Sequence, residues 1–104
     1  METSNNVWTA ETAKQNMIWS RIPEYIKRRI KYNALMGEIC VDIFEDVDPT
    51  KFREEYCTEL VIKYLEILGY VVTIWPDTRY DGYKVMKITW RIYIGSEGCQ
   101  PHNR

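Results

Sequence analysis

The chain has 104 residues, of which 45% are hydrophobic and 28% are charged, and its formal net charge is -1. This length predicts a single domain, and this composition is that of ordinary globular proteins, which excludes wholesale disorder. A net charge so close to zero exerts no global attraction on nucleic acid or acidic membranes, and the apolar runs are far too short to cross a bilayer.

The residues that most often carry catalysis are scarce in this chain. The three cysteines, Cys40, Cys57 and Cys99, form no C-x-x-C pair, and their odd number fits a reducing cytosol better than a disulfide scaffold. A zinc site needs about four ligands, and the one histidine, His102, has only Cys99 near it. No nucleophile-base pair, P-loop or dinucleotide fingerprint is present. We therefore expect no metal, no cofactor and no catalytic residues, and a protein that is not an enzyme.

The first third of the chain predicts two helices after a leader of residues 1–8. Thr9 is a suitable cap for the first helix, whose segment is AETAKQNMIWS. Ser20 is the expected cap of the second helix, because Pro23 suits an early helical position, and Gly37 is the expected stop. The apolar stripe of this second helix consists of Ile22, Ile26, Ile30 and Ala34.

A strand and a long helix follow. The segment EICVDIF alternates as a half-buried strand does, and Asp48 followed by Pro49 is a typical helix start. The helix is expected to run without interruption to Gly69, with Ile62 off the apolar face. That apolar face is predicted to contain Phe52, Tyr56, Cys57, Leu60, Val61, Tyr64, Leu65, Ile67 and Leu68.

The last part of the chain predicts an antiparallel hairpin. YVVTIW is β-branched and aromatic, PDTRYDG contains turn residues, and YKVMKITWRIYI alternates clearly. The fold class is therefore α+β, with two layers and the order α-α-β-α-β-β, in which helices cover one face of a three-stranded sheet. The domain spans residues 9–94 and a polar tail spans 95–104. The strand-helix-strand unit of residues 38–75 suits parallel pairing with a right-handed crossover.

Carboxylates gather in two places, the connection before the long helix and the hairpin turn. They could bind a divalent metal or act as acid and base. The default interpretation is that Asp48 caps a helix and that the others lie in solvated loops, because aspartates there are ordinary turn chemistry. These residues are Glu45, Asp46, Asp48, Asp77 and Asp81.

The second face of the sheet is the feature of most interest. If Met86, Ile88, Trp90 and Ile92 pack under the helices, the alternate side chains Val85, Lys87, Thr89, Arg91 and Tyr93 point away from them. Phe44, Asp42, Val71, Thr73 and Trp75 would join this second face from the neighbouring strands. Such a surface can stack bases on aromatics, form a subunit interface, or lie buried under the first helix. Burial or self-association is favoured.

A basic run, KRRIK, lies in the second helix. It is either a local contact for RNA or another anion, or the solvated face of an amphipathic helix, which is the usual case. The candidate binding residues are therefore Trp75, Lys87, Arg91 and Tyr93 on the sheet, and Arg28 and Arg29 on this helix.

Several short motifs are arranged as in a group of short proteins of tailed phages and large DNA viruses. They are the helix start Thr9-Ala10-Glu11-Thr12-Ala13, the helix stop Gly37, and the motifs Leu68-Gly69-Tyr70 and Ile88-Thr89-Trp90. The chain resembles that group over residues 9–90 and departs from it by continuing past Trp90. The resemblance implies a viral accessory or virion protein, located in the host cytoplasm or the virion, and supplies no catalytic residues.

The functional hypothesis is a binding or assembly module that self-associates or takes a protein partner. It would act either as a virion component or as a small protein that sequesters a host factor or a signalling nucleotide. The alternative is a nucleic-acid-binding domain that uses the open sheet face and the basic run. No membrane partner is expected. The dependence of binding on salt distinguishes the two hypotheses, because binding to nucleic acid weakens steeply as the salt concentration rises and an apolar contact does not.

Overall fold

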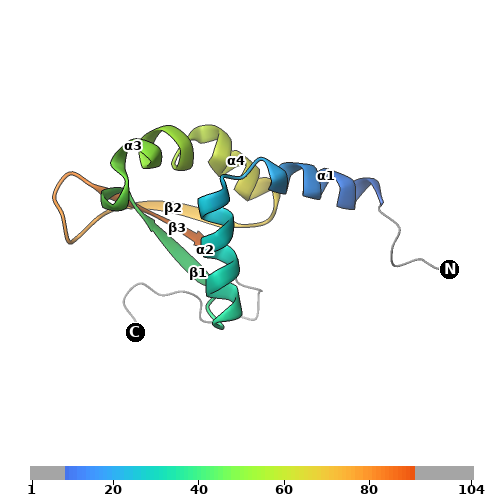
Figure 1. The fold of residues 1–104 in the computed structure, drawn as a ribbon, viewed down its shortest axis with the longest axis horizontal. Helices are drawn as coiled ribbons and strands as arrows, with labels where there is room; N and C mark the ends of the chain where they lie inside the picture. The colour runs from blue at the N-terminus through green and yellow to red at the C-terminus, as the bar shows by residue number, and fades with distance from the viewer. Residues whose placement is uncertain (1–8, 91–104) are drawn as a thin grey trace.

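The computed structural model describes residues 9–90, and the predicted leader, the residues from Arg91 to Ile94 and the polar tail lie outside this range. The described chain is a small α+β fold with a three-stranded sheet (Figure 1), as the sequence predicts. Its elements, in chain order, are α1 (Ala10–Ser20), α2 (Glu24–Leu35), β1 (Cys40–Phe44), the 3-10 turn η2 (Glu45–Val47), α3 (Pro49–Lys51), the π-helical segment η3 (Phe52–Tyr56), α4 (Glu59–Ile67), β2 (Val71–Pro76) and β3 (Lys84–Thr89).

The sheet has the order β1-β3-β2, and β3 pairs antiparallel with both neighbours. β1 and β2 therefore run in the same direction but are not paired with each other. The predicted parallel pairing of these two strands is wrong, because the hairpin brings β3 into the gap between them. The predicted antiparallel hairpin of β2 and β3 is confirmed, with Val72 opposite Ile88 and Trp75 opposite Val85.

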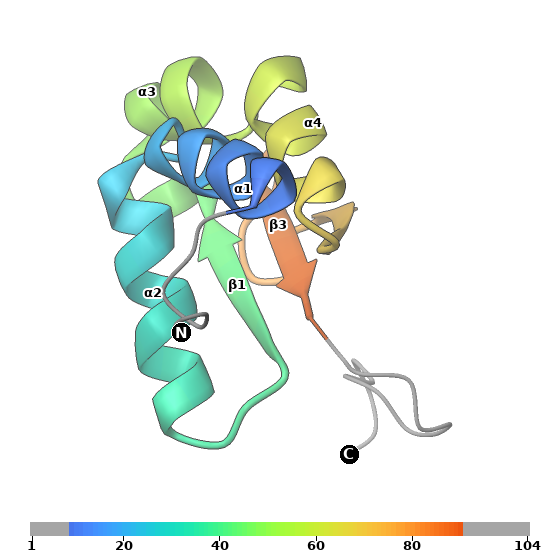
Figure 2. The ribbon, with the colours of Figure 1, turned by 90° about the vertical axis from the view of Figure 1, so that its right-hand side faces the viewer.

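The helices lie on one face of the sheet. α2 packs against β1 and α4 packs against β2, and α1 extends beside α4 (Figures 1 and 2). Burial of apolar side chains between these layers is the main stabilising contribution to such a fold. The buried apolar side chains are Ile22, Ile26, Ile30, Val41, Ile43, Phe52, Tyr56, Val61, Leu65, Met86 and Ile88.

Most of the predicted helix ends are confirmed. The Thr9 hydroxyl accepts a hydrogen bond from the Thr12 N–H at 3.1 Å, and the Asp48 carboxylate accepts one from the Lys51 N–H at 3.2 Å. Gly37 has φ +86°, a left-handed conformation that glycine adopts without steric cost. Ser20 does not cap α2, because it is still part of α1 and its hydroxyl donates to the Met17 carbonyl.

The long helix predicted from Pro49 to Gly69 is interrupted. η3 is wider than an α-helix, and the chain then leaves the helical conformation at Cys57 and Thr58 before Thr58 caps α4. The interruption rotates α4 relative to the segment before it. Leu60 and Ile67, predicted to lie on the apolar face, are therefore exposed, and Ile62, predicted to be exposed, packs against the core.

This rotation yields a test within one helix. Leu65 is 0% exposed and Leu60 is 57% exposed. We expect Leu65→Ala to lower the free energy of unfolding by about 2–5 kcal/mol, because it leaves a cavity in the core. Leu60→Ala should change it by less than about 0.5 kcal/mol. Urea denaturation followed by circular dichroism measures both values. Equal losses of unfolding free energy in the two variants would contradict the rotation of α4.

Candidate binding surface

The face of the sheet that points away from the helices is here called the outer sheet face. Its three rows run across the strands in the register of the two ladders, with Thr89, Lys87 and Val85 of β3 in the centre. The prediction of which side chains point away from the core is confirmed for the described residues. The outer sheet face consists of Cys40, Asp42, Phe44, Val71, Thr73, Trp75, Val85, Lys87 and Thr89.

A hollow of about 440 Å³ opens at one end of the outer sheet face. Its floor contains the apolar row of Phe44, Val85 and Trp75, and Trp75 is 48% exposed. The connection from Pro76 to Arg79 forms one wall. The aromatic and β-branched side chains of this row lie beside polar ones, which is the usual composition of a site that binds another molecule.

Arg79 holds this wall against the sheet. Its guanidinium donates to the Asp77 carboxylate at 2.9 Å and to the Asp46 carboxylate at 2.6 Å, and it lies 4.2 Å from the centre of the Phe44 ring. The hydrogen bonds from Arg79 lower the pKa of Asp77, and the same carboxylates raise the pKa of Arg79. The connection is therefore fixed by charge pairing and by a cation–π contact.

The second cation of the hollow is also paired. Lys87 Nζ lies 2.9 Å from an oxygen of Asp42, directly across the β1–β3 ladder, and the Lys87 side chain is only 14% exposed. Opposite charges in this cross-strand position stabilise each other. Both described cations that line the hollow thus have carboxylate partners, on the outer sheet face for Lys87 and beside it for Arg79.

The other predicted binding residues are not brought to this face. Arg28 and Arg29 belong to α2, on the helical layer that covers the opposite side of the sheet. Arg29 donates to the Tyr25 hydroxyl at 3.0 Å, and Lys27 of the same run lies 3.4 Å from Glu24. Arg91 and Tyr93 lie outside the described residues. Trp75 and Lys87 are therefore the two predicted residues that the structure places together.

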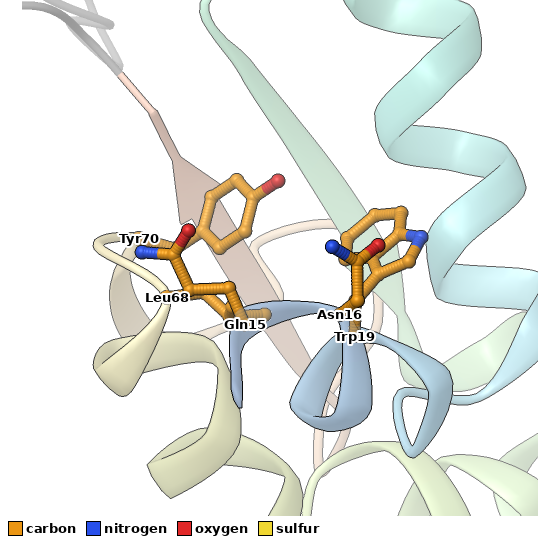
Figure 3. Close-up of a pocket in the computed structure, with 5 residues that line it drawn as sticks. All are labelled: Gln15, Asn16, Trp19, Leu68 and Tyr70. Carbon is orange, nitrogen blue, oxygen red and sulfur yellow. The ribbon is translucent and has the colours of Figure 1, made fainter. Parts of the chain in front are cut away.

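The first helix does not cover the outer sheet face, so the interpretation in which it buries this face is wrong. α1 lies beside α4, and Figure 3 shows a small crevice between α1 and the segment that joins α4 to β2. The crevice is lined by Gln15, Asn16, Trp19, Leu68 and Tyr70. Its two amides are already used within α1, since Gln15 donates to Glu11 and Asn16 donates to the Thr12 carbonyl. The crevice thus lies where α1 contacts the segment that follows α4, and each of these amides spends one donor within α1.

Two acidic residues differ from the sequence-based interpretation. Glu45 and Asp77, predicted to lie in solvated loops, are buried. Glu45 accepts hydrogen bonds from the Lys84 N–H and from Arg53, and Asp77 accepts from Arg79. Each carboxylate thus holds a connection at the end of the sheet through hydrogen bonds. Sequence spacing alone gives no signal for such a role. Asp48 is the helix cap that the sequence predicts.

The cysteines also differ from the expectation. Cys40 is disulfide-bonded, whereas Cys57 is a free and half-buried thiol whose pKa is raised by burial. Within residues 9–90 no group of three or more His, Cys, Asp or Glu side chains is arranged to hold a metal ion. None of the helices described has the length and hydropathy that a bilayer-spanning segment requires.

Comparisons with protein families, with curated proteins and with solved structures find no match for this chain.

The role of Asp77 makes stability depend on pH. Its pKa in the folded protein lies below the ordinary value of 3.8, so its contribution is present above that value and is lost as the pH falls through the lowered pKa. Asp77→Asn should therefore be less stable than the wild type at neutral pH, and the difference should shrink below about pH 4. Thermal unfolding over a pH series measures this, with the exposed Asp81→Asn as the control. A gap that stays constant with pH would contradict the ion pair.

Proposed function

We propose that this protein is a small, non-enzymatic binding or assembly module whose outer sheet face receives a protein partner. The observation that carries the proposal is the combination of an open apolar row with charges that are already paired. Phe44, Val85 and Trp75 form a hollow next to the ion pairs of Lys87 and Arg79. An exposed aromatic anchor in a concave site is typical of the residues that contribute most to protein–protein binding.

The paired charges favour a protein partner over a phosphate-bearing ligand. A phosphate would have to separate Lys87 from Asp42, or Arg79 from Asp46 and Asp77, before either cation could bind it. It would also meet the three carboxylates that these cations now neutralise. A partner with an apolar side chain fills the hollow without breaking either pair, and only displaces water.

The resemblance to short proteins of phages and large DNA viruses supports a viral role for this module. In that role the module is an accessory or virion protein of the host cytoplasm or the virion, and the bound partner is a host factor or another virion subunit. A signalling nucleotide is the less favoured ligand, because of the paired cations. The nucleic-acid alternative requires the outer sheet face and the α2 cations to act together, and these lie on opposite layers.

A displayed library of random peptides tests the proposal. We expect selected peptides to carry apolar or aromatic anchors and to bind with a Kd that changes little between about 0.05 and 0.5 M salt. Trp75→Ser should weaken this binding by about tenfold or more, because it removes the anchor of the hollow. Tyr32→Ser is the matched control, since Tyr32 is an exposed aromatic on the helical layer.

The same salt series, run with a single-stranded oligonucleotide and with a cyclic dinucleotide, distinguishes the alternatives. Oligonucleotide binding that falls steeply with salt would replace the proposal with the nucleic-acid function. Dinucleotide binding that Trp75→Ser abolishes would replace the protein partner with a nucleotide. A selection that yields no peptide dependent on Trp75 would overturn the proposal.

A further inference from the structure

The two outer strands of the sheet have edges of different character. At the β1 edge, the Asn33 side chain of α2 donates to the Cys40 carbonyl at 3.0 Å. That carbonyl faces away from β3, because the preceding carbonyl, of Ile39, accepts from the N–H of Trp90, the residue after β3. At the β2 edge, no residue between 9 and 90 hydrogen-bonds to the outward backbone groups. Among the described residues, β2 is thus an edge whose outward backbone groups have no partner, whereas the β1 edge has at least one outward carbonyl covered by α2.

The hydrogen bonds of the hairpin show which groups this edge presents. Asp77 N–H donates to the Tyr83 carbonyl at 2.8 Å, so Asp77 points its backbone groups toward β3. Backbone direction alternates along a strand. Thr73 and Trp75 therefore also point inward, and Val72 and Ile74 each point an N–H and a C=O outward. Pro76 falls on an outward position, where its missing N–H breaks no bond to β3.

Apart from Pro76 at its end, the β2 edge has none of the features that protect exposed strands against pairing. Val71–Pro76 contains no charged residue, and edges are usually blocked by charges, bulges or covering loops. Its apolar side chains are also unusually exposed to solvent. Val71 is 60% exposed, Trp75 is 48% exposed and Ile74 is 39% exposed. An exposed apolar edge of this kind marks an association site.

We propose that β2 pairs antiparallel with β2 of a second copy, about a twofold axis that passes through Thr73. This register places Val72 opposite Ile74 of the second copy, and the reverse, so that all outward N–H and C=O groups of these two residues are satisfied. On the outer sheet face it places Val71 opposite Trp75 and Thr73 opposite Thr73. Aromatic with β-branched and Thr with Thr are among the cross-strand pairs that stabilise antiparallel sheets.

The complementarity of β2 to itself argues for a second copy rather than a foreign strand. No like charges meet across the axis, because the strand has no charge. The adjacent registers are poorer. In one, Val72 faces Pro76, which has no N–H, and in the other, Ile74 faces Tyr70, whose N–H already donates to the Leu65 carbonyl at 3.0 Å. Each leaves one outward carbonyl of Val72 or Ile74 without a donor in each copy, whereas the register centred on Thr73 satisfies all the outward groups of these two residues.

The dimer would have one six-stranded sheet, with helices on one side and two outer sheet faces joined on the other. Trp75 borders the junction, so each hollow would lie near the pairing edge. This inference concerns the strand edge and goes beyond the proposed function, which concerns the outer sheet face. A dimer can form without any partner in the hollow, and the reverse also holds.

Cysteine cross-linking tests the register. The two Thr73 residues form a pair without mutual hydrogen bonds, whose Cα atoms approach to about 4.5 Å, within the range that a disulfide bridges. We expect Thr73→Cys to form a reducible covalent dimer under mild oxidation, at a level well above the wild-type background. Val71→Cys and Trp75→Cys should cross-link to each other when mixed, and much less to themselves.

Charge substitution gives an independent readout. Thr73→Asp brings two carboxylates together across the axis and should shift the protein toward monomer in light scattering over a concentration series. Thr89→Asp is the matched control, since it adds a carboxylate to the outer sheet face on the central strand and should leave the dimer intact. Circular dichroism checks that both variants fold.

Three results would overturn the inference. The first is a wild-type protein that remains monomeric at every concentration and a Thr73→Cys variant that does not cross-link. The second is self-cross-linking of Val71→Cys above that of Thr73→Cys, which would mean another register. The third is loss of the dimer in Thr89→Asp but not in Thr73→Asp, which would mean that the outer sheet faces, not the β2 edges, form the contact.

Discussion

The central position of β3 is the constraint on which the rest of this structure depends. Met86 and Ile88 point into the helical layer and are 0% exposed, so the register of β3 against both neighbours is fixed by their burial. A slip of one residue would place Lys87 in the core and is excluded by the cost of burying an unpaired charge. The same alternation places Val85 and Lys87 on the outer sheet face, so the core and the candidate binding surface are fixed together.

The electrostatics of the outer sheet face follow from this register. Asp42 and Lys87 meet because their strands pair, and Arg79 reaches Asp46 because the hairpin turn folds toward the end of β1. Each of these cations is paired with carboxylates on or beside the face, and the apolar row next to them is left to contact another molecule. A basic sequence segment is thus a poor guide to a binding site here, because α2 carries its cations on the opposite layer.

Much of the fold could be predicted from local patterns. The alternation in β3, the turn residues before it, and the caps at Thr9 and Asp48 depend on neighbours in the chain, and all are confirmed. The prediction of one long helix failed, because its apolar pattern is continuous in the sequence whereas the helix itself is interrupted. Apolar spacing from Phe52 to Leu68 fits one helix, yet η3 and the break at Cys57 rotate α4, and no residue type in that segment signals a π-helical turn.

The sequence by itself determined the α+β class and which side chains of β3 face away from the core, because both depend on periodicity along one segment. Only the tertiary structure decided that β3 separates β1 from β2, that Glu45 and Asp77 are buried, and that the outward backbone groups of β2 have no partner among the described residues. These features arise from contacts between residues far apart in the chain. A pattern within one segment carries no information on which distant group will satisfy a carboxylate or cover a strand.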